Sequence, residues 1–233
     1  SPGNDNSSEY SSGAAYIFVR NWNTWEEKKK LIASDASSSD EFGSSVAISG
    51  DTIIVGTSSD DSAYVFIRNG DTWEEQAKLT ASDASSFNHF GVSVAISGDA
   101  AIVGSFWDDA AGERSGSAYI FVRNGDTWEE QAKLTASDAA QNDWFGNSVA
   151  ISGDVAIVGS FKDDDAGNSS GSAYIFVRNG DTWKEQKKLT ASDASAHDKF
   201  GSSVAISGDT AIVGSEGNDS GSAYIKYYNE CSQ

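Results

Sequence analysis

The 233-residue chain has one cysteine, one proline and no methionine. The single cysteine, Cys231, excludes an internal disulfide framework. No hydrophobic run approaches the roughly 18 residues that a membrane-spanning helix needs. The sequence starts Ser1-Pro2, and a start without Met is typical of a processed secreted protein or of a trimmed sequence.

Basic residues are also scarce, because 16 Lys and Arg oppose 35 Asp and Glu, which gives a formal net charge of −19. Nucleic-acid binding needs clustered Lys and Arg, so we expect no nucleic-acid partner. An anionic membrane surface would repel the chain for the same reason, and we expect no membrane insertion. Hydrophobic residues make up 38% of the sequence, and 23 glycines bring it into the ordinary globular range. We therefore expect a folded, acidic protein.

The sequence repeats itself almost literally. The motif FGxSVAISGDxxIVG starts at Phe42, Phe90, Phe145 and Phe200, so successive copies are 48, 55 and 55 residues apart. Between them lie three copies of SAYxFxRNGDTWxEQxKLTASDA, at 62–84, 117–139 and 172–194. A fourth, related copy occupies 14–36, and a last half copy, SAYIKYY, occupies 222–228.

Each repeat predicts four antiparallel strands, which are SVAIS, the apolar run TAIVGS, SAYIFVR and the more polar TWEEQAKL. Ser-Gly-Asp joins the first two strands. Asn-Gly-Asp joins the last two, and Asn-Gly is the strongest short hairpin signal. TWEEQAKL is too short and too poorly capped for a helix. A unit of four strands that repeats every 48–55 residues indicates a propeller blade.

We therefore predict an all-β fold, a single β-propeller domain of four four-stranded antiparallel blades over residues 1–233. Three blades are continuous, at 42–82, 90–137 and 145–192. The fourth combines 200–228 with 14–34, so that N- and C-terminal strands close the ring. Its third strand is supplied twice, by 14–20 and by 222–228, and the sequence leaves open which copy is used.

The Phe-Gly opening and the Val-Gly-Ser end of the second strand resemble the FG-GAP repeat of integrin alpha-subunit propellers. The bacterial-type variant, with FGxSVAISGDxAIVG followed by an Asp-rich loop and GSAYxF, is the more similar form, over residues 10–228. The resemblance implies a propeller that binds ligands outside the cell. Integrin-like repeats often hold calcium in a DxDxDG-type loop between strands one and two. Here that loop is only Gly50-Asp51-Thr52 and its equivalents, so the site is not carried over.

Antiparallel order places the loops between strands two and three and between strands four and one on the same face. Among the residues of this face that differ between blades, aromatic and basic side chains are the candidate ligand-binding residues. Exposed aromatics among carboxylates are typical of surfaces that contact sugars or peptides, and packing between adjacent blades is the alternative. The set comprises Phe87, His89, Phe106, Trp107, Arg114, Trp144, Phe161, Lys162 and Lys199.

The loops between strands two and three are also rich in Asp and Asn, and such clustered oxygens suit Ca²⁺. The candidate metal ligands are Asp108, Asp109, Asp163, Asp164 and Asp165, with Asn218, Asp219, Asp60 and Asp61 as weaker members. The alternative is a set of solvated acidic loops. Three N-glycosylation sequons, at Asn6, Asn168 and Asn218, fall in the same loop of the repeat.

Catalysis has little support in the sequence. The two histidines, His89 and His197, form no cluster with zinc-ligand spacing, and no nucleophile elbow occurs. We therefore expect a non-enzymatic, extracellular or cell-surface module that binds carbohydrate or protein ligands, with calcium as a candidate cofactor. The alternative is a structural subunit of an extracellular filament or oligomer, because a surplus strand can complete the sheet of a neighbouring copy. Cys231 could cross-link such copies.

Overall fold

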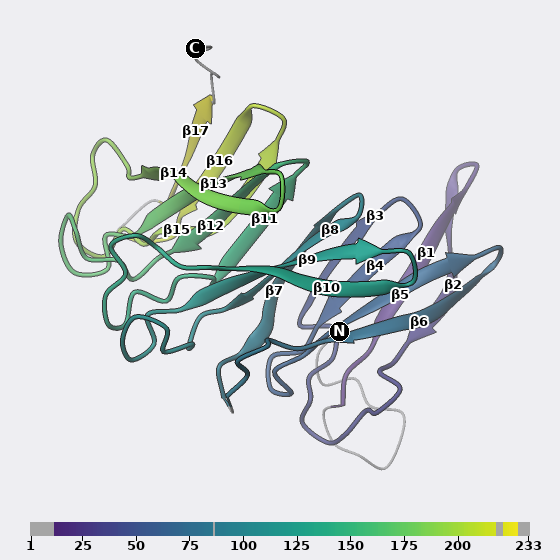
Figure 1. Cartoon of the computed structure of the whole chain (residues 1–233). Coiled ribbons are helices and arrows are strands. Elements are labelled where there is room, and N and C mark those ends of the chain that lie inside the picture. Colours follow the sequence, from purple (N-terminus) through teal and green to yellow (C-terminus); the bar gives the residue numbers. More distant parts are fainter. Residues whose placement is uncertain (1–11, 86, 218–220, 228–233) are drawn as a thin grey trace.

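A computed structural model describes residues 12–85, 87–217 and 221–227, and this part of the chain contains only strands, turns and loops. Three four-stranded antiparallel sheets, here named blades A, B and C, follow one another (Figure 1). Blade A contains β3 (Ser45–Ser49), β4 (Thr52–Gly56), β5 (Ala63–Asn69) and β6 (Thr72–Leu79). Blade B contains β7 (Phe90–Ser97), β8 (Ala100–Ser105), β9 (Ser117–Asn124) and β10 (Thr127–Leu134). Blade C contains β11 (Ser148–Ser152), β12 (Val155–Ser160), β13 (Ser172–Asn179) and β14 (Thr182–Leu189).

A smaller sheet lies at each end of this series. The N-terminal sheet pairs β1 (Ala15–Asn21) with β2 (Thr24–Leu31). The C-terminal sheet has the order β15 (Phe200–Ser207), β16 (Thr210–Ser215) and β17 (Ser222–Tyr227). The all-β class and the four-strand repeat are therefore confirmed for the three continuous blades, and the segment TWxEQxKL is a strand in each of them.

Turn chemistry produces the hairpins that join strands three and four. In blade A, Gly70 has a φ of 62°, a conformation that glycine adopts without a steric penalty. The Thr72 hydroxyl then donates a hydrogen bond of 2.9 Å to the Asn69 carbonyl oxygen across the turn. Blades B and C repeat this bond from Thr127 and Thr182. The Asn-Gly signal in the sequence was therefore sufficient to place these turns.

The Phe-Gly motif builds the interfaces between blades. Phe145 is fully buried and meets the rings of Tyr174 and Phe176 edge-on, at centroid distances of 5.5 and 6.0 Å. The glycine that follows the Phe in each copy of the motif permits a close approach between backbones, as Gly201 after Phe200 shows. A Cβ on Gly159 would lie 2.1 Å from the carbonyl oxygen of Gly201 in the next sheet, so no larger residue fits there. This contact explains why Phe-Gly and Val-Gly recur together.

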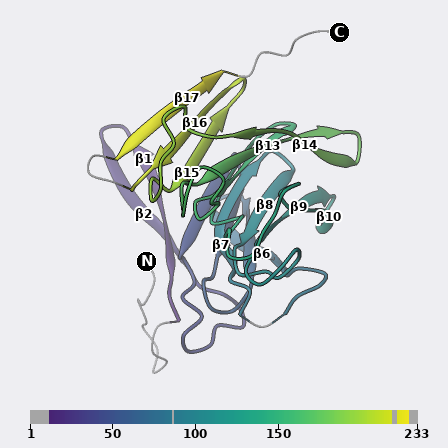
Figure 2. The ribbon, with the colours of Figure 1, turned by 90° about the vertical axis from the view of Figure 1, so that its left-hand side faces the viewer.

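The two terminal segments differ from the sequence prediction, because they form separate sheets. In the described residues β1 pairs with β2, and the residues of 14–34 do not join the sheet of β15 and β16. Figure 1 shows the two sheets at opposite sides of the molecule, and Figure 2 gives the view from the side. The physical reason is that β17 pairs with β16 over six residue pairs and so takes the place beside it that β1 would need. The copy of strand three that completes this sheet is thus 222–227.

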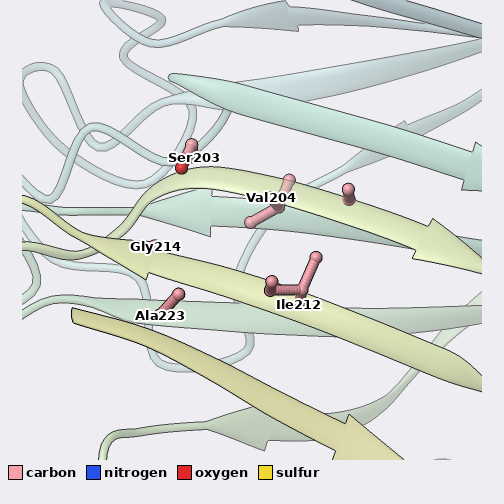
Figure 3. A pocket seen from close by; sticks show the side chains of 6 residues that line it. Ser203, Val204, Ile212, Gly214 and Ala223 are labelled. Atoms are coloured by element: carbon pink, nitrogen blue, oxygen red, sulfur yellow. The ribbon is translucent and has the colours of Figure 1, made fainter.

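Both ends of the series leave apolar side chains uncovered. In β3, Val46 and Ile48 are 60% and 63% exposed, whereas their equivalents in blade B, Val94 and Ile96, are each 8% exposed. At the other end, Ile212 is 41% exposed, whereas the equivalent Ile157 is fully buried. A hollow of about 200 Å³ opens on this sheet between Val204, Ile212 and Ala223 (Figure 3). These are the surfaces that cover each other between adjacent blades elsewhere in the chain.

Candidate functional site

Loops of two kinds share one face of the sheets, here called the loop face. One kind connects strand two to strand three of a blade, such as 106–116 in blade B. The other precedes strand one, such as 80–89 and 135–147. Backbone hydrogen bonds join the two kinds of loop. The Trp107 amide donates to the Asn88 carbonyl oxygen at 3.2 Å, and the Lys162 amide donates to the backbone carbonyl oxygen of Asp143 at 3.3 Å. The start of each long loop is therefore held firmly against the end of the preceding loop.

Five of the predicted ligand-binding residues form one aromatic patch on this face, which comprises His89, Phe106, Trp107, Trp144 and Phe161. The His89 ring lies 4.4 Å from Trp107 and stacks on Phe106 at 5.1 Å. Phe106 lies 5.0 Å from Trp144, and Trp144 meets Phe161 edge-on at 5.4 Å. The patch thus crosses from blade B to blade C. These rings are half-buried against one another and still border solvent, so they combine packing between blades with an accessible surface.

The backbone under the patch is constant, while the side chains on it vary. His89 and Trp144 have φ angles of 55° and 57°, in the left-handed region that bulky residues rarely adopt. Glu41 and Lys199, at the same position of the other repeats, have φ angles of 55° and 54°. The buried Phe that follows each of them anchors this conformation. One fixed backbone position therefore presents four different side chains, a pattern typical of recognition surfaces on rigid scaffolds.

Two cations lie over the tryptophan rings of the patch. The Arg114 guanidinium is 4.5 Å from the centre of the Trp107 ring, and Lys162 Nζ is 3.3 Å from that of Trp144. Such cation–π contacts attract the cation to the face of the ring. Burial lowers the pKa of Lys162, and repulsion from Arg114 and Lys199 lowers it further. The three cations are therefore close enough to affect one another.

The patch also contains unused hydrogen-bond donors. The indole Nε1 atoms of Trp107 and Trp144 are buried, and neither has a hydrogen-bond partner in the described part of the chain. This is unusual, because buried polar groups are nearly always paired and an unpaired one costs about 1–3 kcal/mol. The recurring tryptophans behave differently, since Trp128 and Trp183 donate to Gln76 and Gln131 of the preceding blade at 3.0 Å. Their recurrence at one strand position of the repeat agrees with this structural role.

Two predicted members lie outside the aromatic patch. Phe87 is 77% exposed, and its backbone amide donates to the Asp61 carboxylate at 2.8 Å. Lys199 pairs with Glu216 at 3.3 Å. Phe87 therefore belongs to the loop face without contacting the rings, and Lys199 contributes mainly its charge.

The candidate metal ligands lie in a different arrangement, which includes a lysine. Lys188 Nζ forms ion pairs with Asp138, Asp163 and Asp165, at 2.7 Å to Asp138 and 2.8 Å to Asp163. The Tyr174 hydroxyl donates to both Asp138 and Asp163. Burial opposes ionisation of Asp138, but the bonds from Lys188 and Tyr174 outweigh it and lower its pKa. The three carboxylates could hold a metal ion, yet an ammonium group already lies among them.

This Tyr–Lys–Asp network recurs in every blade, and the sequence analysis missed it. In blade B, Lys133 pairs with Asp83 and Asp108, and Tyr119 donates to both carboxylates. In blade A, Lys78 pairs with Asp35 and Asp60. The signal was present, because Tyr and Lys recur 14 residues apart in each repeat and every copy carries Asp in the two adjoining loops. One Asp of each network (Asp35, Asp83 or Asp138) follows the last strand of the preceding unit, and the others lie in the loop between strands two and three of the blade itself. The network therefore ties neighbouring sheets together.

The remaining candidates vary in their surroundings. Asp109 is exposed and accepts a hydrogen bond of 2.7 Å from the Arg114 amide, and Asp164 is exposed as well. Asn168 is an exposed side chain, as a glycosylation site requires. Asn6, Asn218 and Asp219 lie outside the described residues.

Asp143 is a buried carboxyl group next to the patch. Burial raises its pKa to about 6 from 3.8; a hydrogen bond from the Ala140 amide opposes this, and the charges of Asp163 and Asp164 add to it. The folded state therefore binds this proton more tightly than the unfolded state does. It follows that this group makes the protein less stable as the pH rises from about 4 to about 6.

Asp143→Asn should consequently raise the free energy of unfolding by about 1–2 kcal/mol near neutral pH, with no gain at about pH 3.5. Blade B already has Asn88 at this position, where its amide donates to Asp108 at 3.1 Å. Urea denaturation of both proteins across this pH range measures the difference. The exposed turn residue Asp154 provides the control, Asp154→Asn. Parallel stability curves for Asp143→Asn and the wild type would contradict the assignment.

A comparison with protein families matches the FG-GAP repeat to four segments, at 25–66, 73–121, 128–176 and 183–226. Together these segments cover well over half of the chain, and each runs from strand four of one unit to strand three of the next. No curated protein sequence matches the chain. The described residues include no helix that could cross a lipid bilayer.

Proposed function

Because this chain belongs to the FG-GAP repeat family, whose propellers are generally non-enzymatic and often bind protein ligands, we propose that it is a binding module that uses its loop face. The observation that carries the proposal is the aromatic patch with Arg114 and Lys162 over its tryptophans. Phe106 and Phe161 occupy the same position in blades B and C, but the other side chains of this set do not recur between blades, so the fold does not require them. Carbohydrate is the first ligand class that we propose, and protein is the second.

The patch has the physical properties of a recognition surface. Trp and Arg dominate binding energy at interfaces, since they combine a large apolar area with directed polar groups. Rings held by neighbouring rings lose little conformational entropy when a ligand docks. We also propose an extracellular location, in line with the occurrence of FG-GAP repeats in extracellular proteins, and a glycan on Asn168.

Trp107→Ala and Trp144→Ala should each abolish binding to the glycans or matrix proteins that the wild type retains on an array. Each ring is half-buried, so we expect a loss of stability below the about 3–5 kcal/mol of a fully buried aromatic. Trp22→Ala is the matched control, because Trp22 is 89% exposed and lies in the turn between β1 and β2. Array binding, with thermal melting of each variant, tests this. Wild-type binding by both patch variants would refute the proposal.

Calcium assistance is a further part of the proposal, and Lys188 is the means to test it. An ion at Asp138, Asp163 and Asp165 has to displace the Lys188 ammonium group. In Lys188→Met the three carboxylates lose their counter-charge, so Ca²⁺ should raise the melting temperature more than Mg²⁺ does at equal ionic strength. Equal shifts with the two ions would indicate screening and would exclude a calcium site there.

We propose in addition that the series of sheets closes into a ring when β1 replaces β17 beside β16. The exposed Val46 and Ile48 of β3 would then be covered by the sheet of β15 and β16, as Val94 and Ile96 are covered by blade A. The polar contacts for this interface are available. The Ser148 hydroxyl donates to the Gly201 carbonyl at 2.8 Å between blade C and the next sheet, and Ser203 could make the same bond to Gly43.

A filament subunit is the second candidate function, and the exposed surfaces at both ends favour it. If β15 and β16 of one copy cover β3 of another copy, the contact is head-to-tail and does not close on itself. Sedimentation at several protein concentrations, with and without reductant, distinguishes the two arrangements. A mass that rises with concentration supports the filament, and a constant monomer mass excludes it.

A further inference from the structure

Positive charge gathers at the aromatic patch, although the chain as a whole is strongly acidic. Arg114 and Lys162 have no carboxylate within ion-pair distance among the described residues, whereas Lys78, Lys133 and Lys188 are each paired with two or more. Lys199 adds a third charge, which Glu216 partly offsets. A ligand can therefore bind Arg114 and Lys162 without breaking an existing ion pair. The patch is therefore suited to a negatively charged group.

The unused hydrogen-bond donors indicate the same chemistry. Trp107 Nε1 and Trp144 Nε1 can only donate, and so can the Arg114 and Lys162 side chains. A ligand that satisfies all four must offer several acceptor atoms close together. A carboxylate does so, because its two oxygens accept up to about four hydrogen bonds. Hydrogen bonds to a charged acceptor are also stronger than those to a neutral one.

The surroundings restrict the size of the anion. Asp109 lies beside Arg114, since its carboxylate accepts a hydrogen bond from the Arg114 backbone amide. Asp164 and Glu216 lie in the corresponding loops of the next two units. A polyanion that extended beyond the patch would meet these carboxylates and be repelled. The ligand should therefore combine one carboxylate with a compact, partly apolar ring that packs on Phe106 and Phe161.

Building on the proposed function, we infer that the aromatic patch binds a carboxylated sugar residue, such as a uronic acid at the end of a neutral glycan. The carboxylate lies between Arg114 and Lys162 and accepts hydrogen bonds from the indole N–H groups of Trp107 and Trp144. Both cations lie over these rings, so only short movements bring them to the carboxylate. The apolar face of the sugar ring packs on the remaining aromatic side chains.

The test follows the indole N–H resonances of the ¹⁵N-labelled full chain during titration with methyl glucuronide. We expect the Trp107 and Trp144 signals to shift, while those of the exposed Trp22 and Trp25 stay fixed. Methyl glucoside, which has the same ring without the carboxylate, should bind at least tenfold more weakly. Arg114→Gln and Lys162→Gln should each weaken glucuronide binding at least fivefold and leave glucoside binding unchanged. Lys187→Gln removes the same charge from the exposed outer strand β14 and should have no effect.

The other outcomes overturn the inference in distinguishable ways. If glucuronide and glucoside bind with equal affinity, and neither Arg114→Gln nor Lys162→Gln changes that affinity, the patch does not recognise the carboxylate. The proposal that the chain is a binding module would still stand. If acetate binds as tightly as glucuronide, the sugar ring contributes nothing and a sugar ligand is excluded. Tighter binding of the peptide Gly-Gly-Glu than of glucuronide would exclude a sugar ligand as well. If no probe shifts either indole signal, the inference fails. The proposed function then depends on the array measurement alone.

Discussion

Phe145→Ala should lower the free energy of unfolding by about 3–5 kcal/mol. The Phe145 side chain is fully buried between blades B and C, and it contacts the rings of both Tyr174 and Phe176. Its loss leaves a cavity at an interface that cannot collapse, because the backbones beside it are already in contact at Gly104 and Gly146. Denaturant unfolding measures the change.

Phe87→Ala is the matched control, because it removes the same side chain from a position two residues before His89. Phe87 is 77% exposed, so we expect its removal to change stability by less than about 0.5 kcal/mol. A small loss for Phe145→Ala would mean that the blades are not held by the Phe-Gly contact.

Gly159→Ala should destabilise the protein by more than about 3 kcal/mol, since the added methyl group would overlap a backbone oxygen of the next sheet. Gly56 and Gly104 are in the same situation, with a Cβ only 1.9 and 2.0 Å from the carbonyl oxygens of Gly91 and Gly146. Neither backbone can move without separating two blades. Thermal melting and far-ultraviolet circular dichroism of the variant test this expectation.

Gly214→Ala makes the same change in the C-terminal sheet and tests ring closure. In the described structure, a Cβ on Gly214 would meet only Ser203, whose hydroxyl can rotate away. If the sheets close into a ring, Gly43 of blade A approaches Gly214 as Gly201 approaches Gly159. We therefore expect Gly214→Ala to be nearly as damaging as Gly159→Ala in the closed ring. A harmless Gly214→Ala beside a damaging Gly159→Ala would show that the ring stays open.

The sequence by itself determined the strands, their order within each blade and the face on which the variable loops lie. These features depend on short-range interactions. Asn69-Gly70 specifies a hairpin because glycine adopts positive φ without strain, and the apolar runs of β4, β8 and β12 can be buried only between sheets. The comparison of repeats also separated Trp128 and Trp183, which hold blades together, from Trp107 and Trp144, which do not recur.

Only the tertiary structure decided which of these side chains meet. The sequence grouped Asp163 and Asp165 as metal ligands, but Lys188 reaches them from a strand more than 20 residues away and forms ion pairs with both. It offered two segments for the strand beside β16, and in the described structure β17 takes that place. Trp107 and Trp144 were candidates separately, yet their contact and their unpaired indole N–H groups depend on how blades B and C pack. Long-range contacts of this kind are set by the approach of whole sheets, which local sequence patterns do not encode.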